Sequence, residues 1–212
     1  MLRWISLVVL SAFCLVAFPL VTYAQVTNLV LNPSFEDDEV ILDDPDWQAW
    51  ATWGWENGLE STVAIDEAEF IDGTRSLRVE PKGDENWYFI VLNLPMPVEL
   101  GGEYTASFWA KAQEARPLTA QMKATDNTVS FAETGFELTT EWSEYSFPFT
   151  SESAEVKLEV FCAGNDVPFW LDFVYVYEGV YVEGIMPSEA ATPVEPAGKL
   201  AARWGEIKSV DF

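Results

Sequence analysis

The residues of this 212-residue chain that could do chemistry are mostly carboxylates. The sequence holds 35 aspartates and glutamates against 11 lysines and arginines, and it contains no histidine. Catalytic systems that need an imidazole, such as Ser-His-Asp and Cys-His sites, and the usual zinc sites are therefore excluded. A carboxylate pair that hydrolyses glycosidic bonds stays open by composition, but the sequence places no acid and nucleophile pair.

The formal net charge of −24 also limits the class of partner. A strongly anionic surface disfavours nucleic acids and anionic membranes, and it suits calcium, neutral polymers or basic partners. The same charge would keep an extracellular domain soluble, which explains most of these carboxylates equally well.

Two carboxylates are distinguished by their positions. Glu36 follows the turn NPSF at residues 32–35, so Phe35 can be buried while Glu36 holds a cation. Asp172 lies within the apolar run 169–177, where an unpaired charge would be costly. These positions favour a β-sandwich fastened by a calcium ion, and solvated surface acids are the alternative.

A second group of side chains suits a neutral glycan, which aromatic rings hold by stacking on sugar faces while polar side chains meet the hydroxyls. Alternation in segment 87–94 puts Ile90 and Leu92 on an apolar face and Trp87 and Phe89 on the opposite one. The residues predicted to share one concave surface are Trp87, Phe89, Gln121, Lys123, Phe131 and Phe161. Polar residues on these strands are few for such a site.

Four tryptophans lie close together at positions 47, 50, 53 and 55. They form either a loop that covers the cleft and supplies stacking rings, or a small core that anchors a long loop. We expect Trp50 or Trp53 on the ligand side.

The elements that must position these residues are strands. Alternation with a period of two recurs in segments 104–111, 118–125, 145–149 and 156–162, and it is followed by the apolar run 169–177. Turn signals rich in glycine, asparagine and aspartate separate these segments. The pattern predicts an all-β sandwich of about eight to eleven strands.

The domain organisation is read from the ends of the chain. Residues 1–24 have a basic start, an apolar run and a small-residue exit, which predicts a cleaved signal peptide, with an uncleaved membrane helix as the alternative. Residues 25–179 form the predicted sandwich, residues 180–198 a proline-rich linker, and residues 199–212 a short C-terminal segment with helical spacing. That segment is either a docking or attachment motif or a frayed tail.

Cysteine usage fits this organisation. Cys14 would leave with the signal peptide, so Cys162 would be the only cysteine of the mature chain and no internal disulfide could form. Something other than a disulfide must then fasten the fold in an oxidising compartment.

Five sequence blocks follow one another in a familiar order. They are residues 28–36 (NLVLNPSFE), 72–79 (DGTRSLRV), 100–112 (LGGEYTASFWAKA), 138–142 (LTTEW) with Tyr145, and 170–173 (WLDF). Over about residues 26–178 the chain resembles the CenC-like carbohydrate-binding modules, the family 4/9 group, whose fold is a galactose-binding-like jelly roll.

The resemblance implies specific residues. A calcium ion would be held by the side chains of Glu36, Asp72 and Asp172 and by the backbone carbonyl of Arg75, and a tryptophan at the position of Trp87 would line the binding cleft. Carboxylate and carbonyl oxygens are the ligands that calcium prefers.

Three functions therefore remain. The first is a secreted or cell-surface, non-catalytic protein that binds a β-glucan, xylan or similar polysaccharide, with calcium as a structural ion. The second is a cell-surface structural or protein-interaction module of the same fold, which contacts the envelope or a protein through residues 199–212. The third, a glycoside-active enzyme, lacks a placed pair of catalytic carboxylates.

Overall fold

Alternating apolar and polar residues build eleven β-strands and two short 3-10 helices in the part of the chain that the computed structural model describes, which is residues 26–37, 49–93, 95–183 and 185. In chain order the elements are β1 (Trp50–Gly54), η1 (Glu56–Glu60), β2 (Thr62–Asp66), β3 (Ser76–Glu80), η2 (Asn86–Tyr88), β4 (Phe89–Asn93), β5 (Met96–Pro97), β6 (Glu103–Ala112), β7 (Arg116–Ala124), β8 (Ser130–Leu138), β9 (Ser143–Thr150), β10 (Glu155–Phe161) and β11 (Phe169–Glu178).

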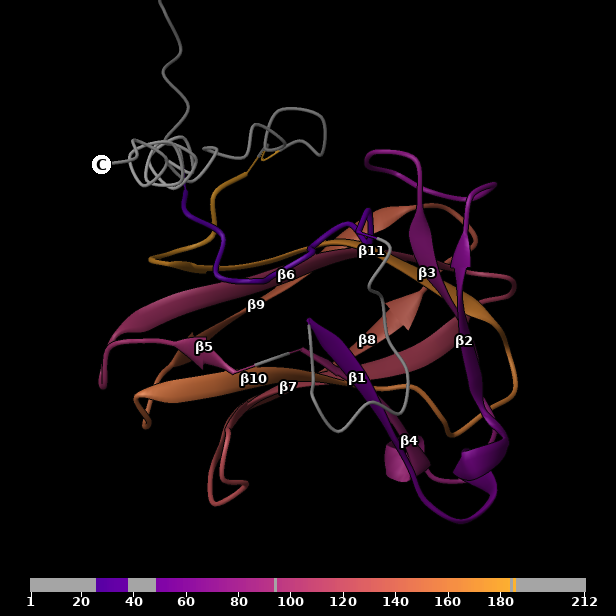
Figure 1. Ribbon diagram of the computed structural model, residues 1–212, viewed down its shortest axis with the longest axis horizontal. Helices are drawn as coiled ribbons and strands as arrows, with labels where there is room; N and C mark the ends of the chain where they lie inside the picture. The colour runs from indigo at the N-terminus through magenta and orange to yellow at the C-terminus, as the bar shows by residue number, and fades with distance from the viewer. Residues whose placement is uncertain (1–25, 38–48, 94, 184, 186–212) are drawn as a thin grey trace, which may run out of the picture.

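The strands form two antiparallel sheets (Figure 1). One sheet has the order β1-β4-β10-β7-β8, with β5 also paired to β10, and the other has the order β2-β3-β11-β6-β9. In Figure 1, β6, β9 and β11 cross the upper part of the molecule, and β7 and β10 cross the lower part. The prediction of an all-β sandwich is confirmed.

The core between the sheets follows the alternation that the sequence predicts for three strands. The buried inward-facing residues are Tyr104, Ala106, Phe108 and Ala110 of β6, Leu118, Ala120, Met122 and Ala124 of β7, and Val156, Leu158 and Val160 of β10. The Phe35 ring is fully buried and packs on Trp50, with ring centroids 5.0 Å apart. Phe35 therefore joins the core, as predicted.

Strand β4 faces the other way from the prediction. Phe89 and Val91 belong to the core, whereas Ile90 and Leu92 lie on the outer face of the sheet. All five residues of β4 are buried, so this run has no polar face that would fix its phase in the sequence. The predicted placement of Phe89 beside Trp87 is corrected for this reason.

The first described segment, residues 26–37, is attached to the last strand. Leu29 donates its N–H to the Val176 carbonyl at 2.8 Å, and Val174 donates to the Pro33 carbonyl at 2.9 Å. Between these two bonds, the Asn28 side-chain amide donates to the Val174 carbonyl at 2.9 Å. These bonds hold Phe35 and Glu36 against the sandwich.

Several predictions fall wholly or mostly outside the described residues. These are the signal peptide at 1–24, Trp47, most of the linker at 180–198, and the C-terminal segment 199–212. Among the residues that the structure does describe, no helix is long and apolar enough to cross a membrane.

Candidate functional site

A groove lies on the outer face of the sheet that contains β1, β4, β10 and β7. Its volume is about 520 Å³, and it is lined by Thr52, Trp53, Trp87, Ile90, Leu92, Gln121, Lys123, Asn127, Lys157, Glu159 and Phe161. Side chains of a strand alternate between the two faces, so the residues between the core positions of β7 and β10 form the groove floor. We call this feature the outer groove.

Indole rings are exposed at one end of the outer groove. Trp53 and Trp87 are 43% and 40% exposed, and their rings stack with centroids 6.4 Å apart and planes at 25°. The Trp55 ring also stacks with Trp53, with centroids 6.4 Å apart and planes at 8°. Burial of such rings is strongly favourable, so their exposed faces offer a surface for the apolar face of a ring-shaped ligand.

Close packing of the two 3-10 helices positions these rings. The N–H of Trp55 donates to the Tyr88 carbonyl at 2.9 Å, which joins the end of β1 to η2. At Gly58 in η1, a Cβ atom would lie 1.9 Å from that same Tyr88 oxygen. Only glycine allows η1 to approach η2 this closely, and this approach sets Trp55 beside Trp53 and Trp87.

The floor of the outer groove carries a connected polar network. Lys157 Nζ lies 2.7 Å from Glu159 Oε1, and both side chains are less than a tenth exposed. Gln121 Nε2 donates to Glu159 Oε2 at 2.5 Å, and Ser130 Oγ donates to Gln121 Oε1 at 2.5 Å. Because each member is held by its neighbours, the network presents fixed donors and acceptors to a ligand.

The structure brings together five of the eight residues predicted for ligand binding: Trp53, Trp87, Gln121, Lys123 and Phe161. It does not bring Trp50, Phe89 or Phe131 to the outer groove. Trp50 is 2% exposed, and its Nε1–H donates to the Asn32 carbonyl at 3.0 Å, so it closes the core instead. Phe89 lies in the core, and Phe131 is half-buried against it.

Sequence reasoning missed Lys157 and Glu159, and it expected few polar residues here. The signal was present, since Lys157 and Glu159 alternate with Val156, Leu158 and Val160 on the same face as Phe161. The expectation of a groove poor in polar groups is corrected by the buried network that these two residues form.

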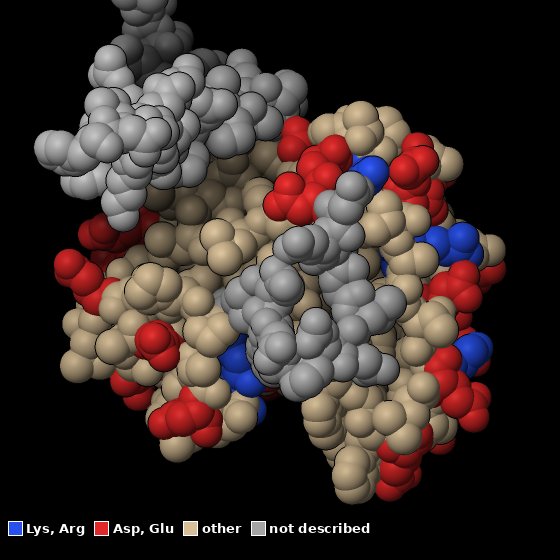
Figure 2. All heavy atoms as spheres, in the orientation of Figure 1, with Lys and Arg blue, Asp and Glu red and all other residues tan. Residues whose placement is uncertain are grey.

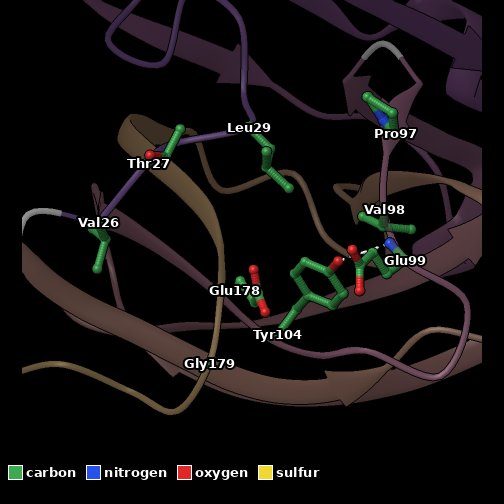
Figure 3. Close-up of a pocket in the computed structure, with 9 residues that line it drawn as sticks. All are labelled: Val26, Thr27, Leu29, Pro97, Val98, Glu99, Tyr104, Glu178 and Gly179. Atoms are coloured by element: carbon green, nitrogen blue, oxygen red, sulfur yellow. Dashed lines mark hydrogen bonds between the residues drawn. The ribbon is translucent and has the colours of Figure 1, made fainter.

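A larger cavity of about 780 Å³ lies elsewhere, between residues 26–29, residues 97–99 and the ends of β6 and β11 (Figure 3). Its aromatic ring, Tyr104, is 5% exposed and stacks on Phe149. The Tyr104 hydroxyl is engaged by the Glu99 N–H at 2.8 Å. Because this cavity offers no open ring face, the outer groove is the better candidate site.

A second cluster joins three predicted calcium ligands at one turn. Glu36 accepts hydrogen bonds from the N–H groups of Thr74 and Arg75 at 2.7 and 2.8 Å, and from Thr74 Oγ1 at 2.9 Å. Asp172 accepts from the N–H groups of Ile71 and Asp72 at 2.8 and 3.0 Å. The turn at residues 71–75 is therefore fastened both to the first described segment and to β11.

The electrostatics of this cluster follow from burial. Burial raises the pKa of Asp172 to about 7, although N–H groups of Ile71, Asp72 and Phe173 oppose the shift and the charge of Asp72 adds to it. Burial also raises the pKa of Asp72, which accepts a 2.6 Å hydrogen bond from Ser34 Oγ and is close enough to feel the charge of Glu36. Burial and the neighbouring negative charges thus favour the protonated forms of Asp72 and Asp172.

Calcium ligation at this cluster meets one constraint. In the described part of the chain, no group of three or more histidine, cysteine, aspartate or glutamate side chains is arranged to hold a metal. Two of these carboxylates at a time, with backbone carbonyls and water, would have to form the shell of six to eight oxygens that calcium takes. Each carboxylate has about four acceptor positions and uses three or fewer in the hydrogen bonds described above, so this is compatible with the geometry.

Comparison with known proteins agrees with this fold. The sequence profile of the CBM 4/9 family, described as "Carbohydrate binding domain", matches residues 27–166. No curated protein sequence matches the chain.

Solved structures of similar architecture share little sequence. A CBM4 domain is 18% identical and has a TM-score of 0.57, covering 71% of this chain and 99% of its own. A Bacteroides thetaiotaomicron protein with a proposed sugar-binding role is 14% identical with a TM-score of 0.57, covering 72% and 100%. The CBM22-1 xylan-binding domain of Paenibacillus barcinonensis Xyn10C is 14% identical with a TM-score of 0.51, covering 76% and 100%. These likenesses show the fold.

Proposed function

The chain belongs to the CBM 4/9 family of carbohydrate-binding domains, and from this premise we propose that it is a secreted or cell-surface, non-catalytic protein that binds a polysaccharide in the outer groove. The observation that carries the proposal is the pairing of two exposed, stacked indoles, Trp53 and Trp87, with a buried polar network on one groove floor. The groove volume of about 520 Å³ lies within the range of roughly 300–1,000 Å³ that is typical of ligand pockets.

The roles of the side chains follow from their chemistry. Trp53 and Trp87 would stack on the C–H faces of sugar rings, where an indole loses contact with water and gains dispersion contacts. Glu159 would accept hydrogen bonds from sugar hydroxyls, and Gln121 is held by Ser130 and Glu159 in a fixed orientation. A groove ordered before binding loses little conformational entropy when the glycan arrives.

Binding without hydrolysis is supported by the acids of the outer groove. Glycoside hydrolysis ordinarily needs two carboxyl groups that flank the scissile bond. Of the residues that line the groove, one is acidic, and this residue, Glu159, is ion-paired to Lys157. A paired, buried carboxylate is poorly suited to act as a general acid.

Glycan binding is tested by affinity gel electrophoresis in soluble β-glucans, xylans and galactans. We expect one or more of these polymers to retard the protein, and Trp87→Ala and Trp53→Ala each to weaken binding about tenfold, or ~1.4 kcal/mol. Phe70→Ala is the matched control, because Phe70 is also exposed, at 39%, but does not line the groove. No retardation in any polymer would favour a structural or protein-interaction module of the same fold.

We also propose a structural calcium ion at the turn of residues 71–75, with ligands drawn from Glu36, Asp72, Asp172 and the Arg75 carbonyl. Two of the three carboxylates would ligate the ion at a time, and water would complete the shell. Three acids from segments far apart in the sequence meet there, and a divalent cation would offset their repulsion. Calcium at about 100-fold its Kd would stabilise the domain by ~2.7 kcal/mol and raise Tm by roughly 5–10 °C.

The calcium proposal is tested by thermal melts in EDTA and in calcium. Magnesium serves as a control, because it demands a smaller and more regular shell. Glu36→Gln should reduce the calcium-dependent rise in Tm. Identical melts in EDTA and calcium would remove Glu36 and Asp172 as calcium ligands.

A further inference from the structure

Lys123 differs from the other basic residues that the structure describes. Five of the other basic residues form ion pairs: Arg75 with Glu67, Arg78 with Glu80, Lys82 with Asp166, Lys111 with Glu69, and Lys157 with Glu159. The remaining one, Arg116, donates to the Val167 and Cys162 carbonyls at 2.7 and 2.6 Å. The Lys123 side chain lines the outer groove and forms no hydrogen bond or ion pair with the residues that the structure describes.

The position of Lys123 makes the lack of a side-chain partner energetically costly. In the register of β7 and β10, Lys123 lies directly opposite Lys157. Two like charges in a cross-strand pair repel each other. Glu159 neutralises Lys157 at 2.7 Å and is itself held by Gln121, so it is not free to turn toward Lys123. Among the described residues that line the groove, two cations and one carboxylate leave one net positive charge.

This local charge is opposite to that of the whole molecule. The chain carries a formal net charge of −24, and acidic side chains clearly outnumber basic ones on the face shown in Figure 2. Glu133 on β8 is opposite Gln121 and is exposed, but it forms no ion pair with Lys123. The charge of Lys123 therefore stays available to an anionic group that a ligand brings into the groove.

The global and local charges together define the ligand class. A polymer with an acid on every unit would be repelled by the anionic surface. A mostly neutral chain with an isolated acid would escape most of this repulsion, because physiological salt screens charges beyond about 8 Å. A lysine ammonium is a compact charge with three donors, which suits a single carboxylate.

Resting on the proposed glycan binding, we propose that the outer groove selects a largely neutral glycan that carries an isolated uronic acid, whose carboxylate pairs with Lys123. Trp53 and Trp87 stack on the neutral sugar rings at one end of the groove. The carboxylate replaces the missing partner of Lys123 and relieves its repulsion with Lys157.

Two matched pairs of oligosaccharides test this by isothermal titration calorimetry. The first pair is xylotetraose with and without one glucuronic acid branch, and the second is cellotetraose with and without one C6 oxidised to a carboxylate. Tetragalacturonic acid is the fully charged probe. A hydrogen bond to a charged group is typically worth about tenfold in affinity or more, so in at least one pair we expect the acidic member to bind about tenfold tighter. Tetragalacturonic acid should bind more weakly than that member.

Variants show whether the charge of Lys123 causes the preference for the acidic ligand. Lys123→Met should bring the ratio of acidic to neutral affinity close to one, and Lys123→Arg should keep the preference. Lys82→Met is the control, because Lys82 pairs with Asp166 and does not line the groove, and it should leave the ratio unchanged. Raising the salt concentration should reduce the wild-type ratio.

Three results would overturn the inference. Equal affinity within both pairs, a preference that persists in Lys123→Met, or tighter binding of tetragalacturonic acid would each refute selection of an isolated acid by Lys123, while glycan binding itself would stand. If none of the five probes binds and no polysaccharide retards the protein in gels, the proposed function fails together with the inference.

Discussion

Removing one charge of the buried Lys157–Glu159 pair should destabilise the fold more than removing both charges. Lys157→Met takes away the ammonium 2.7 Å from Glu159 and leaves a buried carboxylate whose remaining side-chain partner is Gln121. Breaking a buried pair from one side costs about 3–5 kcal/mol. The remaining hydrogen bond from Gln121 places Lys157→Met near the lower end, at about 3 kcal/mol. Glu159→Gln should cost about as much, because Lys157 then stays buried without a counter-ion.

The double variant Lys157→Met/Glu159→Gln should cost only about 1 kcal/mol. It contains no buried charge, and the new amide oxygen at position 159 can still accept from Gln121. Urea denaturation followed by tryptophan fluorescence gives the three free energies of unfolding. Simple addition, with a double variant about 6 kcal/mol less stable than the wild type, would refute the view that desolvated charge governs this site.

Further predictions concern the rest of the fold. In EDTA, the folded state keeps the Asp172 proton up to pH of about 7 while the unfolded chain releases it near 3.8, so stability should fall by up to about 4 kcal/mol between these values and Asp172→Asn should flatten the curve. Gly58→Ala places a Cβ 1.9 Å from the Tyr88 oxygen, so both Tm and glycan affinity should fall, because η1 moves from η2. Phe35→Ala should cost about 3–5 kcal/mol in urea denaturation, against less than ~0.5 for Phe70→Ala.

The sandwich could be predicted because several of its strands carry apolar residues on one face and mostly polar residues on the other. In β6, β7 and β10 a period of two fixes which side chains enter the core, and the structure agrees for all three. The phase of β4 could not be predicted in this way, because apolar residues lie on both of its faces. There the sequence holds an unbroken apolar run, and only the neighbouring strands decide that Phe89 turns inward.

The candidate site could be predicted in part for a related reason. Gln121, Lys123 and Phe161 were found because they lie on the polar phase of well-patterned strands. Trp50 could not be separated from Trp53, because adjacent strand ends and a backbone carbonyl from residue 32 decide which indole closes the core. The ion pair of Lys157 and Glu159 was missed because burial of charge depends on what surrounds a strand.

The place of β11 in its sheet has a consequence for the order in which the protein can assemble. Both β3 and β6 pair with β11, so the β2-β3 hairpin cannot join the β6-β9 pair until the last strand of the domain is available. The first described segment also needs β11 before it can dock, since Leu29 and Pro33 form backbone hydrogen bonds with Val176 and Val174. The N-terminal and C-terminal parts of the domain must therefore meet late. Such non-local closure is typical of all-β domains that fold in milliseconds to seconds, and a chain shortened before residue 169 would be left with two unjoined halves of a sheet.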